Sequence, residues 1–402
     1  MTIKGRHDRA VAVNLVDRGG LTRNTQHHFS ALDGLRGVAA LVVLALHALT
    51  PFNLDYFLPH AVLAVDFFFL LSGFVIGYAY EHRLLVNMSV KEFIRIRLIR
   101  LYPLILVGTI FGFLVFCLKS VFEHHAAESS LTMVVALVGS IFMLPTSLIH
   151  DQGWESIYPF NPPAWSLFFE ILINVIYALV LRKLSGRAFK AILVFGCVGV
   201  FVQAYYLNAV TGGETLRTIV CGFGRVVFPF FLGIFLFRWQ LAHNRFRFSL
   251  PVVILSVLLV ATLICPSGPF KWIYESAIVV FVFPAIVILG TRTEPSPAVR
   301  ATCLFLGKLS YPLYILHYPF VRLFSHLTRV LAVRSDQVWI MICLEMICAV
   351  VFATIAMKVF DEPVRAWLTM HWRSASPTRS RALQTLDNHL TGPIVKPELT
   401  GD

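Results

Sequence analysis

The sequence contains few charged residues. Asp, Glu, Lys and Arg make up 14% of its 402 residues, against about 25% of an ordinary globular chain. Hydrophobic residues reach 57%, with 35 phenylalanines, and the mean hydropathy is +0.74. A soluble core cannot absorb so much apolar surface, so the composition excludes a set of soluble domains and predicts a helical bundle in lipid. Disordered, collagenous and disulfide-rich classes are excluded as well.

Cysteine pairs and metal-ligand spacings are also missing. None of the seven cysteines forms a Cys-x-x-Cys pair, and nearly all lie in or beside apolar runs, which excludes a disulfide framework and a zinc site. We interpret these cysteines as small buried hydrophobic residues. The pairs His27–His28 and His124–His125 lack ligand spacing on a helix face, so no metal is expected. We also expect no bound cofactor.

A cleavable secretion signal is not recognisable either. Residues 1–28 are polar and basic, and an apolar run follows without a small-residue cleavage pattern. We therefore expect a cytoplasmic amino-terminal segment at 1–28, one membrane domain at 29–372, and a disordered cytoplasmic tail at 373–402. Lys plus Arg outnumber Asp plus Glu by 34 to 22. In a membrane protein this excess marks cytoplasmic loops, and no nucleic-acid partner is expected.

Eleven apolar runs approach the length of about 20 residues that a spanning helix needs. They lie near 31–49, 62–80, 100–118, 131–148, 164–182, 188–208, 222–238, 249–265, 272–290, 304–326 and 338–358. If all eleven crossed, the basic clusters at 182–190 and 238–247 would face outward, against the positive-inside rule. The run at 131–148 is the weakest, because it is short and contains Pro145.

Leaving that run out places the basic clusters inside, except that Arg329 and Arg334 then face outward. The prediction is an all-α polytopic membrane protein of about ten transmembrane helices, with both termini cytoplasmic. An external segment near 119–163 is a candidate to fold back into the bundle, since non-helical backbone is tolerated at membrane depth only where protein covers it.

Ionisable residues inside the membrane cost at least about 2.5–3.5 kcal/mol each, so each is a functional hypothesis. They are Arg36, His47, Asp66, Glu170, His317 and Glu345, with Arg225 near a span end. Arg36 and His47 are eleven residues apart, which is three helical turns plus roughly 20°, so both side chains point the same way about 16 Å apart. This spacing suits a site that spans the membrane. A snorkelling arginine and a hydrogen-bonded histidine are the alternative.

Two carboxylates are expected at the depth of His47. Asp66 and Glu170 both enter the membrane from the outer side, on different helices. A carboxylate beside an imidazole would fix its tautomer and raise its basicity, as a general base requires. Both residues are therefore catalytic or orienting candidates, although either could instead satisfy a helix end.

Two arginines lie at the opposite membrane face. Arg97 and Arg100 are three residues apart in KEFIRIRLIRLYP and hence on one side of a helix. They are able to bind a phosphorylated cytoplasmic ligand such as a nucleotide, or they only follow the positive-inside rule. His317 lies between Pro312 and Pro319, which kink a helix and often border a cavity. A histidine bonded within the bundle is the alternative for His317.

Five segments in register resemble the acyltransferase 3 family of integral-membrane acyltransferases, over roughly residues 28–370. The segments are LDGLRGVAALVVLALH, VDFFFLLSGFVIGY, IRLIRLYP, PAWSLFFEI and LGKLSYPLYILHYP. They carry Arg36 and His47, Asp66 and Ser72, Arg97 and Arg100, Trp165, Ser166 and Glu170, and Ser310, Tyr311 and His317.

The resemblance implies a bundle of about ten helices that moves an acyl group, commonly acetyl from cytoplasmic acetyl-CoA, onto an extracytoplasmic hydroxyl, usually of a carbohydrate. The acceptor would be a surface polysaccharide, an oligosaccharide or a glycolipid. Some relatives carry an additional extracytoplasmic hydrolase-like domain, for which we expect no room in this chain. A scheme that needs a second domain would then depend on a partner from polysaccharide biosynthesis.

The expected roles follow the motifs. Arg36, Arg97 and Arg100 would bind the donor phosphates, and His47 would act as the base or as a transient acyl carrier, oriented by Asp66 or Glu170. The residues expected to line the acceptor path or pore are Ser72, Trp165, Ser166, Tyr311 and His317. Intramembrane Arg, His and Asp also build permeation paths, so a flippase or transporter for glycans or lipid-linked sugars is the competing function, and a scaffold is a third.

Overall fold

The computed structural model describes residues 28–123, 129–151, 154–242 and 248–374. Most of the expected amino-terminal segment and nearly all of the expected tail therefore lie outside the described residues. The described chain is almost entirely helical, with one short antiparallel strand pair formed by β1 His150–Asp151 and β2 Trp154–Glu155.

The helices follow one another along the chain with short connections. They are α2 Ser30–Leu49, α3 Ala64–Ile76, α4 His82–Val86, α5 Val90–Glu123, α6 Ser130–Ile141, α7 Ala164–Val180, α8 Gly186–Leu207, α9 Ile219–Ala242, α10 Val252–Ile264, α11 Lys271–Ala277, α12 Phe283–Gly290, α13 Pro297–Leu316, α14 Tyr318–Val330, α15 Val338–Ala356 and α16 Glu362–Ser374. Short 3-10 turns lie at η1 Thr50–Phe52, η2 Asp55–Phe57, η3 Ala61–Leu63, η5 Leu181–Lys183 and η7 Ser335–Gln337.

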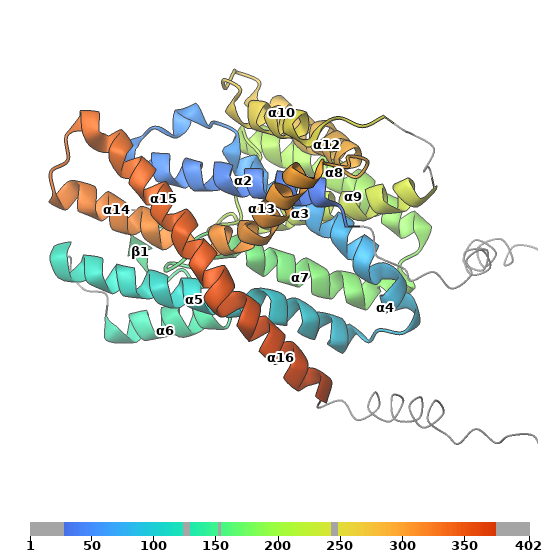
Figure 1. The fold of residues 1–402 in the computed structure, drawn as a ribbon, viewed down its shortest axis with the longest axis horizontal. Coiled ribbons are helices and arrows are strands. Elements are labelled where there is room, and N and C mark those ends of the chain that lie inside the picture. Colours follow the sequence, from blue (N-terminus) through green and yellow to red (C-terminus); the bar gives the residue numbers. More distant parts are fainter. Residues whose placement is uncertain (1–27, 124–128, 152–153, 243–247, 375–402) are drawn as a thin grey trace, which may run out of the picture.

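Three of the spanning helices contain a π-helical turn. The turn η4 Gly77–Glu81 joins α3 to α4, η6 Ile278–Val282 joins α11 to α12, and η8 Met357–Asp361 joins α15 to α16. The last of these produces the long α15–α16 segment that runs diagonally across the bundle (Figure 1). Such turns often occur at functional sites.

The described chain contains eight helical segments that are long and apolar enough to cross a membrane. Two further helices, α10 and α13, belong to the same bundle (Figure 1), so the prediction of an all-α polytopic membrane protein is confirmed. The run at 131–148 contains only the 12-residue helix α6. Such a helix rises about 18 Å, well short of the roughly 30 Å hydrocarbon core.

The segment after α6 folds back into the bundle, as the sequence suggested. The Thr146 amide donates to the Ile157 carbonyl at 2.9 Å, and the Tyr158 hydroxyl donates to the Met143 carbonyl at 2.8 Å. Burial raises the pKa of Tyr158 above its usual value, so this hydroxyl stays protonated. The Phe160 side chain is fully buried. Protein therefore covers this irregular backbone, which is the condition for its presence at membrane depth.

The re-entrant segment also repairs a break in another helix. The expected span 304–326 is divided at His317 into α13 and α14. Pro319 has no amide hydrogen and so cannot bond the Ile315 carbonyl four residues earlier. The Asn161 side chain donates to that carbonyl instead, at 2.8 Å. The break predicted from the two prolines is thus stabilised by a residue from a distant segment.

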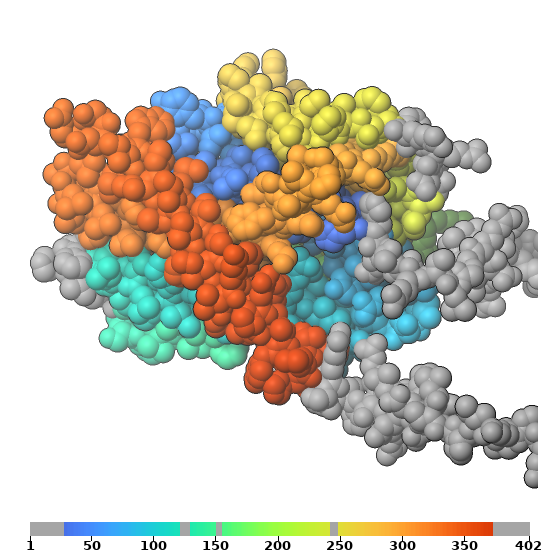
Figure 2. Space-filling view, in the orientation of Figure 1, coloured from blue at the N-terminus to red at the C-terminus, as the bar shows by residue number. Residues whose placement is uncertain are grey.

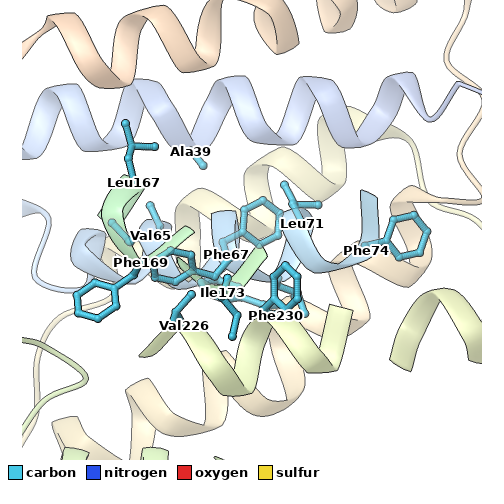
Figure 3. Packing of buried hydrophobic residues seen from close by; sticks show 14 of the residues in the cluster. Ala39, Val65, Phe67, Leu71, Phe74, Leu167, Phe169, Ile173, Val226 and Phe230 are labelled. Carbon is cyan, nitrogen blue, oxygen red and sulfur yellow. The ribbon is translucent and has the colours of Figure 1, made fainter. Parts of the chain in front are cut away.

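The apolar core is centred on α3, whose phenylalanines lie among α2, α7 and α9 (Figure 3). Glycines allow the closest crossing. A Cβ atom built on Gly73 would lie 1.9 Å from the Phe230 carbonyl oxygen, and one built on Gly233 would lie 2.1 Å from the Leu70 carbonyl oxygen. Small residues at such contacts let membrane helices approach closely.

The helices α2 and α13 approach each other in the same way and lie side by side (Figure 1). A Cβ atom on Gly37 would lie 2.4 Å from Leu306 Cβ, and one on Gly307 would lie 2.4 Å from Asp33 Cβ. Glycines on both helices are therefore part of one tight seam. The seam brings the polar side chains of α2 within direct reach of α13.

We expect the substitution Gly37→Leu to force α2 and α13 apart and to destabilise the protein by about 1–3 kcal/mol, the usual range for overpacking. The matched control is Gly199→Leu, in the middle of α8, where a Cβ atom would have no neighbour within 4 Å. Thermal unfolding in detergent measures both. Equal melting temperatures for the two variants would contradict the seam.

Candidate functional site

Arg36 is held by α13 at one end of the bundle, which we call the arginine end. Its Nε donates to Ser310 Oγ at 2.9 Å, and its Nη2 donates to the Gly307 carbonyl at 2.7 Å. Asp33, one turn earlier on α2, lies 3.0 Å from Nη2 and balances the charge. This pair was not predicted from the sequence, although residues three apart on a helix lie close enough to form an ion pair.

His47 contacts the same helix at the other end of the bundle, the histidine end. His47 Nδ1 lies 2.9 Å from His317 Nε2, and the two rings lie nearly parallel with centroids 5.0 Å apart. Arg36 and His47 thus both face α13, which confirms the common stripe predicted from their spacing. Arg36 precedes His47 on α2, and its partner Ser310 precedes His317, the partner of His47, at the end of α13. The two helices therefore run parallel.

The hydrogen bonds assign the tautomers of the two histidines. His317 Nδ1 lies 3.0 Å from the Leu313 carbonyl oxygen, which can only accept, so Nδ1 carries the proton. In a neutral imidazole the other nitrogen, His317 Nε2, is then an acceptor, and His47 Nδ1 must donate to it. The lone pair of His47 is therefore on Nε2, in a half-buried ring. This is the state that a general base or a nucleophile requires.

The expected contact of His47 with Asp66 or Glu170 is not formed. Asp66 Oδ2 lies 2.6 Å from Arg225 Nη2, and Glu170 Oε1 accepts from Arg97 at 2.6 Å and from Ser72 at 3.0 Å. Arginine neighbours occupy both carboxylates because a buried charge needs a partner. The orienting contact of His47 comes from His317 instead.

Arg225 has a central structural role that was not predicted from the sequence. It donates to Asp66 and to the carbonyls of Val62 and Gly212, at 3.2 Å or less for the shortest bond to each. Its guanidinium lies over the ring of Trp165, 5.1 Å from the centroid. Trp165 was expected to line the acceptor path, and the structure places it against this ion pair, 8% exposed.

A cavity at the arginine end collects most of the other expected site residues; we call it the arginine cavity. It encloses about 100 Å³. The expected residues that line it are Arg36, Ser72, Arg97, Arg100, Ser166, Glu170 and Tyr311. Ser310 and Tyr314 of α13 line it as well.

The cations of the arginine cavity outnumber the anions that pair with them. Arg36 pairs with Asp33, and Arg97 pairs with Glu170. The Nε of Arg97 is buried without a hydrogen-bond partner. Within the described part of the chain, Arg100 makes no ion pair with a carboxylate. The cavity is therefore suited to an anionic group at Arg100.

The cavity does not extend to the histidine pair. Tyr314 and Phe68 line its inner part, whereas His47 and His317 do not line it. The ring centroids of Tyr314 and His317 are 6.2 Å apart, and those of Tyr314 and Phe68 are 5.6 Å apart. The two aromatic rings lie between the arginine cavity and the histidines, so the membrane-spanning site that the spacing of Arg36 and His47 suggested is not one open space.

Ser166 and Tyr311 also make hydrogen bonds within the protein. The Ser166 hydroxyl lies 2.7 Å from the Tyr314 hydroxyl, and the Tyr311 hydroxyl donates to the Leu101 carbonyl. Both carboxyl oxygens of Glu345 are buried without a hydrogen-bond partner. Over the described ranges, no group of three or more His, Cys, Asp or Glu side chains is placed to hold a metal ion.

Comparisons with known proteins give a consistent result. A family model described as an acyltransferase domain matches residues 29–358. A protein named protein 2 in picA locus, from Rhizobium radiobacter, is 32% identical over 166 residues, which are 39% of this chain and 85% of that protein. No solved structure matches the chain significantly.

Two longer matches have lower identity. Peptidoglycan O-acetyltransferase OatA of Listeria monocytogenes is 23% identical over 372 residues, which cover 86% of this chain and 57% of that protein. O-acetyltransferase OatA of Staphylococcus aureus is 23% identical over 365 residues, covering 84% and 57%. The chain therefore spans little more than half the length of these OatA relatives.

The Asp66–Arg225 pair should be essential for stability. The substitution Asp66→Asn leaves a buried guanidinium without its counter-charge and should cost about 3–5 kcal/mol, whereas Asp66→Leu combined with Arg225→Met should recover much of that loss. Asp336→Asn is the control, because its pair with Arg334 is exposed and should contribute little. Thermal unfolding in detergent tests this. A loss at Asp66 no larger than that at Asp336 would contradict it.

Proposed function

The chain belongs to the acyltransferase 3 family, whose model covers residues 29–358, and on this premise we propose that it is a membrane O-acetyltransferase. It transfers an acetyl group from cytoplasmic acetyl-CoA to a hydroxyl group of an extracytoplasmic carbohydrate, such as a surface polysaccharide, an oligosaccharide or a glycolipid. The names of the OatA relatives support transfer to oxygen, and peptidoglycan in the Listeria name supports a carbohydrate acceptor.

One observation carries the proposal. The α2–α13 seam holds Arg36 at one end and leaves the Nε2 lone pair of His47 available at the other. A donor bound at the arginine end and an alcohol that arrives at the histidine end would meet along this seam. In this proposal the arginine end faces the cytoplasm of a bacterium, and both chain termini lie on that side of the inner membrane.

The donor binds through its phosphates at the arginine end. The charge distribution favours Arg100 as the main phosphate ligand, because Arg36 and Arg97 are already paired with carboxylates. A planar guanidinium suits this role, since it pairs with phosphate in a bidentate way. The buried Nε of Arg97 provides one further donor.

The proposed reaction needs a nitrogen lone pair, which His47 Nε2 provides, and a group that takes up the hydroxyl proton. In the direct route His47 Nε2 takes the hydroxyl proton, the hydroxyl oxygen attacks the thioester carbonyl carbon, the carbon–sulfur bond breaks, and the CoA thiolate takes up the proton. In the covalent route Nε2 attacks the carbonyl first, the carbon–sulfur bond breaks and the CoA thiolate leaves. The alcohol oxygen then attacks the acetyl carbonyl carbon, the carbon–nitrogen bond breaks and returns its electron pair to the imidazole, and the hydroxyl proton goes to the thiolate. Both routes use the same tautomer, which the hydrogen bond to His317 favours.

The thioester must pass Tyr314 and Phe68 to reach His47. These two rings close the inner part of the arginine cavity and contact each other edge to face. Rotation of aromatic side chains opens such contacts without moving the helices. We therefore propose that donor binding displaces the two rings and joins the cavity to the histidine pair.

The function is tested by incubating the purified protein with radiolabelled acetyl-CoA and a panel of carbohydrates. Label should move to the carbohydrate, and His47→Ala should lower the rate by at least about 10²-fold, the lower range of general base catalysis. His82→Ala is the control, because His82 is an exposed histidine on α4. Movement of a glycan across vesicles without acetyl transfer would favour the flippase instead.

His317 should act as a positioning residue for His47. His317→Ala should lower kcat by about 10²-fold with little change in the KM for the donor, because the tautomer of His47 is no longer favoured. His317→Gln places a carbonyl acceptor near the position of Nε2 and should restore part of the rate. Nitrogen NMR of His47 should show an unprotonated Nε2. Equal rates for the alanine variant and the wild type would exclude this role.

A further inference from the structure

A second cavity lies at the arginine end, between α5 and α16; we call it the terminal cavity. It has a volume of about 690 Å³, within the range of small-molecule sites. Figure 2 shows the red α15–α16 segment lying across the blue-green α5, against which α16 packs. Arg100 lines both this cavity and the arginine cavity, so one residue borders both spaces.

The volumes of the two cavities indicate that they bind different parts of a ligand. The arginine cavity, at about 100 Å³, is smaller than the roughly 300–1,000 Å³ of a typical small-molecule site, so a nucleotide fits the terminal cavity better. The terminal cavity is several times larger. A ligand with a bulky anionic head and a narrow arm fits the pair of spaces, with the head in the larger one.

The terminal cavity presents cations whose charge is not fully compensated. Arg83 and Arg365 line it together with Arg100. Arg365 pairs with Asp361 at 3.1 Å, and its Nε is buried without a hydrogen-bond partner. The guanidinium of Arg83 lies 5.4 Å above the ring of Tyr80. Guanidinium groups at this density favour a ligand with more than one phosphate.

Two carboxylates also line the cavity, and they do not cancel this charge. Glu362 Oε1 accepts from Lys308 Nζ at 3.2 Å, so its charge is balanced from outside the cavity. Glu92 lies on the first turn of α5. Glu92 is thus the one carboxylate that offsets the charges of Arg83 and Arg100, and the net charge of these three lining groups stays positive.

The cavity also offers aromatic surfaces. Tyr80 and Trp372 both line it, and the guanidinium of Arg95 lies 5.3 Å from the ring of Trp372. Nucleobases stack on such rings, which contributes about 1–3 kcal/mol per base. The π-helical turn η4 contains Tyr80, and η8 immediately precedes the part of α16 that carries Arg365. The turn η4 therefore borders the cavity through Tyr80, and η8 ends one residue before Glu362, which lines it.

We propose that the terminal cavity binds the 3′-phosphorylated adenosine diphosphate part of the donor, with its pantetheine arm passing Arg100 into the arginine cavity. The adenine stacks on Tyr80 or Trp372, and the phosphates bind Arg83, Arg100 and Arg365. This inference rests on the proposed acetyl-CoA donor. The phosphate of an anionic lipid headgroup is also negatively charged and also accepts hydrogen bonds through its oxygens, so the test must separate the two sources.

The test measures equilibrium binding of radiolabelled acetyl-CoA to the full-length protein in nanodiscs of phosphatidylcholine, with adenosine 3′,5′-bisphosphate as competitor. Arg83→Gln and Arg365→Gln should each weaken binding about tenfold, and the bisphosphate should displace the donor from the wild type. Arg187→Gln is the matched control, an exposed arginine in the first turn of α8. The affinity of this control should not change, and Arg83→Gln and Arg187→Gln should melt like the wild type, whereas Arg365→Gln should melt earlier because the buried Asp361 loses its partner.

A shorter donor separates nucleotide recognition from a structural effect. S-acetylpantetheine lacks the nucleotide, so its turnover should be the same in Arg83→Gln, Arg365→Gln and the wild type. Equal losses with both donors, or tenfold effects from Arg187→Gln, would overturn the inference. A second set of nanodiscs contains phosphatidylglycerol. Variants that bind acetyl-CoA normally but no longer retain this lipid would also overturn the inference, because they would assign the cavity to a lipid. If the wild type itself fails to bind acetyl-CoA, the proposed function fails with it.

Discussion

The close parallel contact of α2 and α13 is the constraint on which the candidate site depends. Glycines at Gly37 and Gly307 remove the side chains that would otherwise separate the two backbones. The remaining distance is short enough for Arg36 to bond a backbone carbonyl of α13 and for His47 to bond His317 directly. Geometry that needs an accuracy of tenths of an ångström is thus built on two packed helices rather than on loops.

Charge pairing explains most of the other polar residues in this apolar bundle. Asp66 pairs with Arg225, Glu170 with Arg97, and Glu81 with Arg238. Each pair removes a charge that would be costly in a low-dielectric interior. Against this background an arginine that borders two cavities and makes no ion pair with a carboxylate in the described chain, as Arg100 does, is better explained by a ligand than by the fold.

The sequence was sufficient where a single helix or a local feature decides the outcome. Helical periodicity placed Arg36 and His47 on one stripe, and shortness together with Pro145 excluded a crossing at 131–148. Partners on different helices were not predictable in this way. His47 and His317 are 270 positions apart. The expected depth favoured Asp66 and Glu170 instead, but the structure places Glu170 at the arginine end, beside Arg97. The π-helical turns likewise leave no periodic pattern in the sequence.

The bond from Asn161 to the Ile315 carbonyl has a consequence for control of the reaction. This bond stabilises the backbone two residues before His317, at the break that the prolines create. The re-entrant segment and the histidine pair are therefore mechanically coupled. In the proposed acetyl transfer, a displacement of the re-entrant segment would change the orientation of His317 without touching either imidazole.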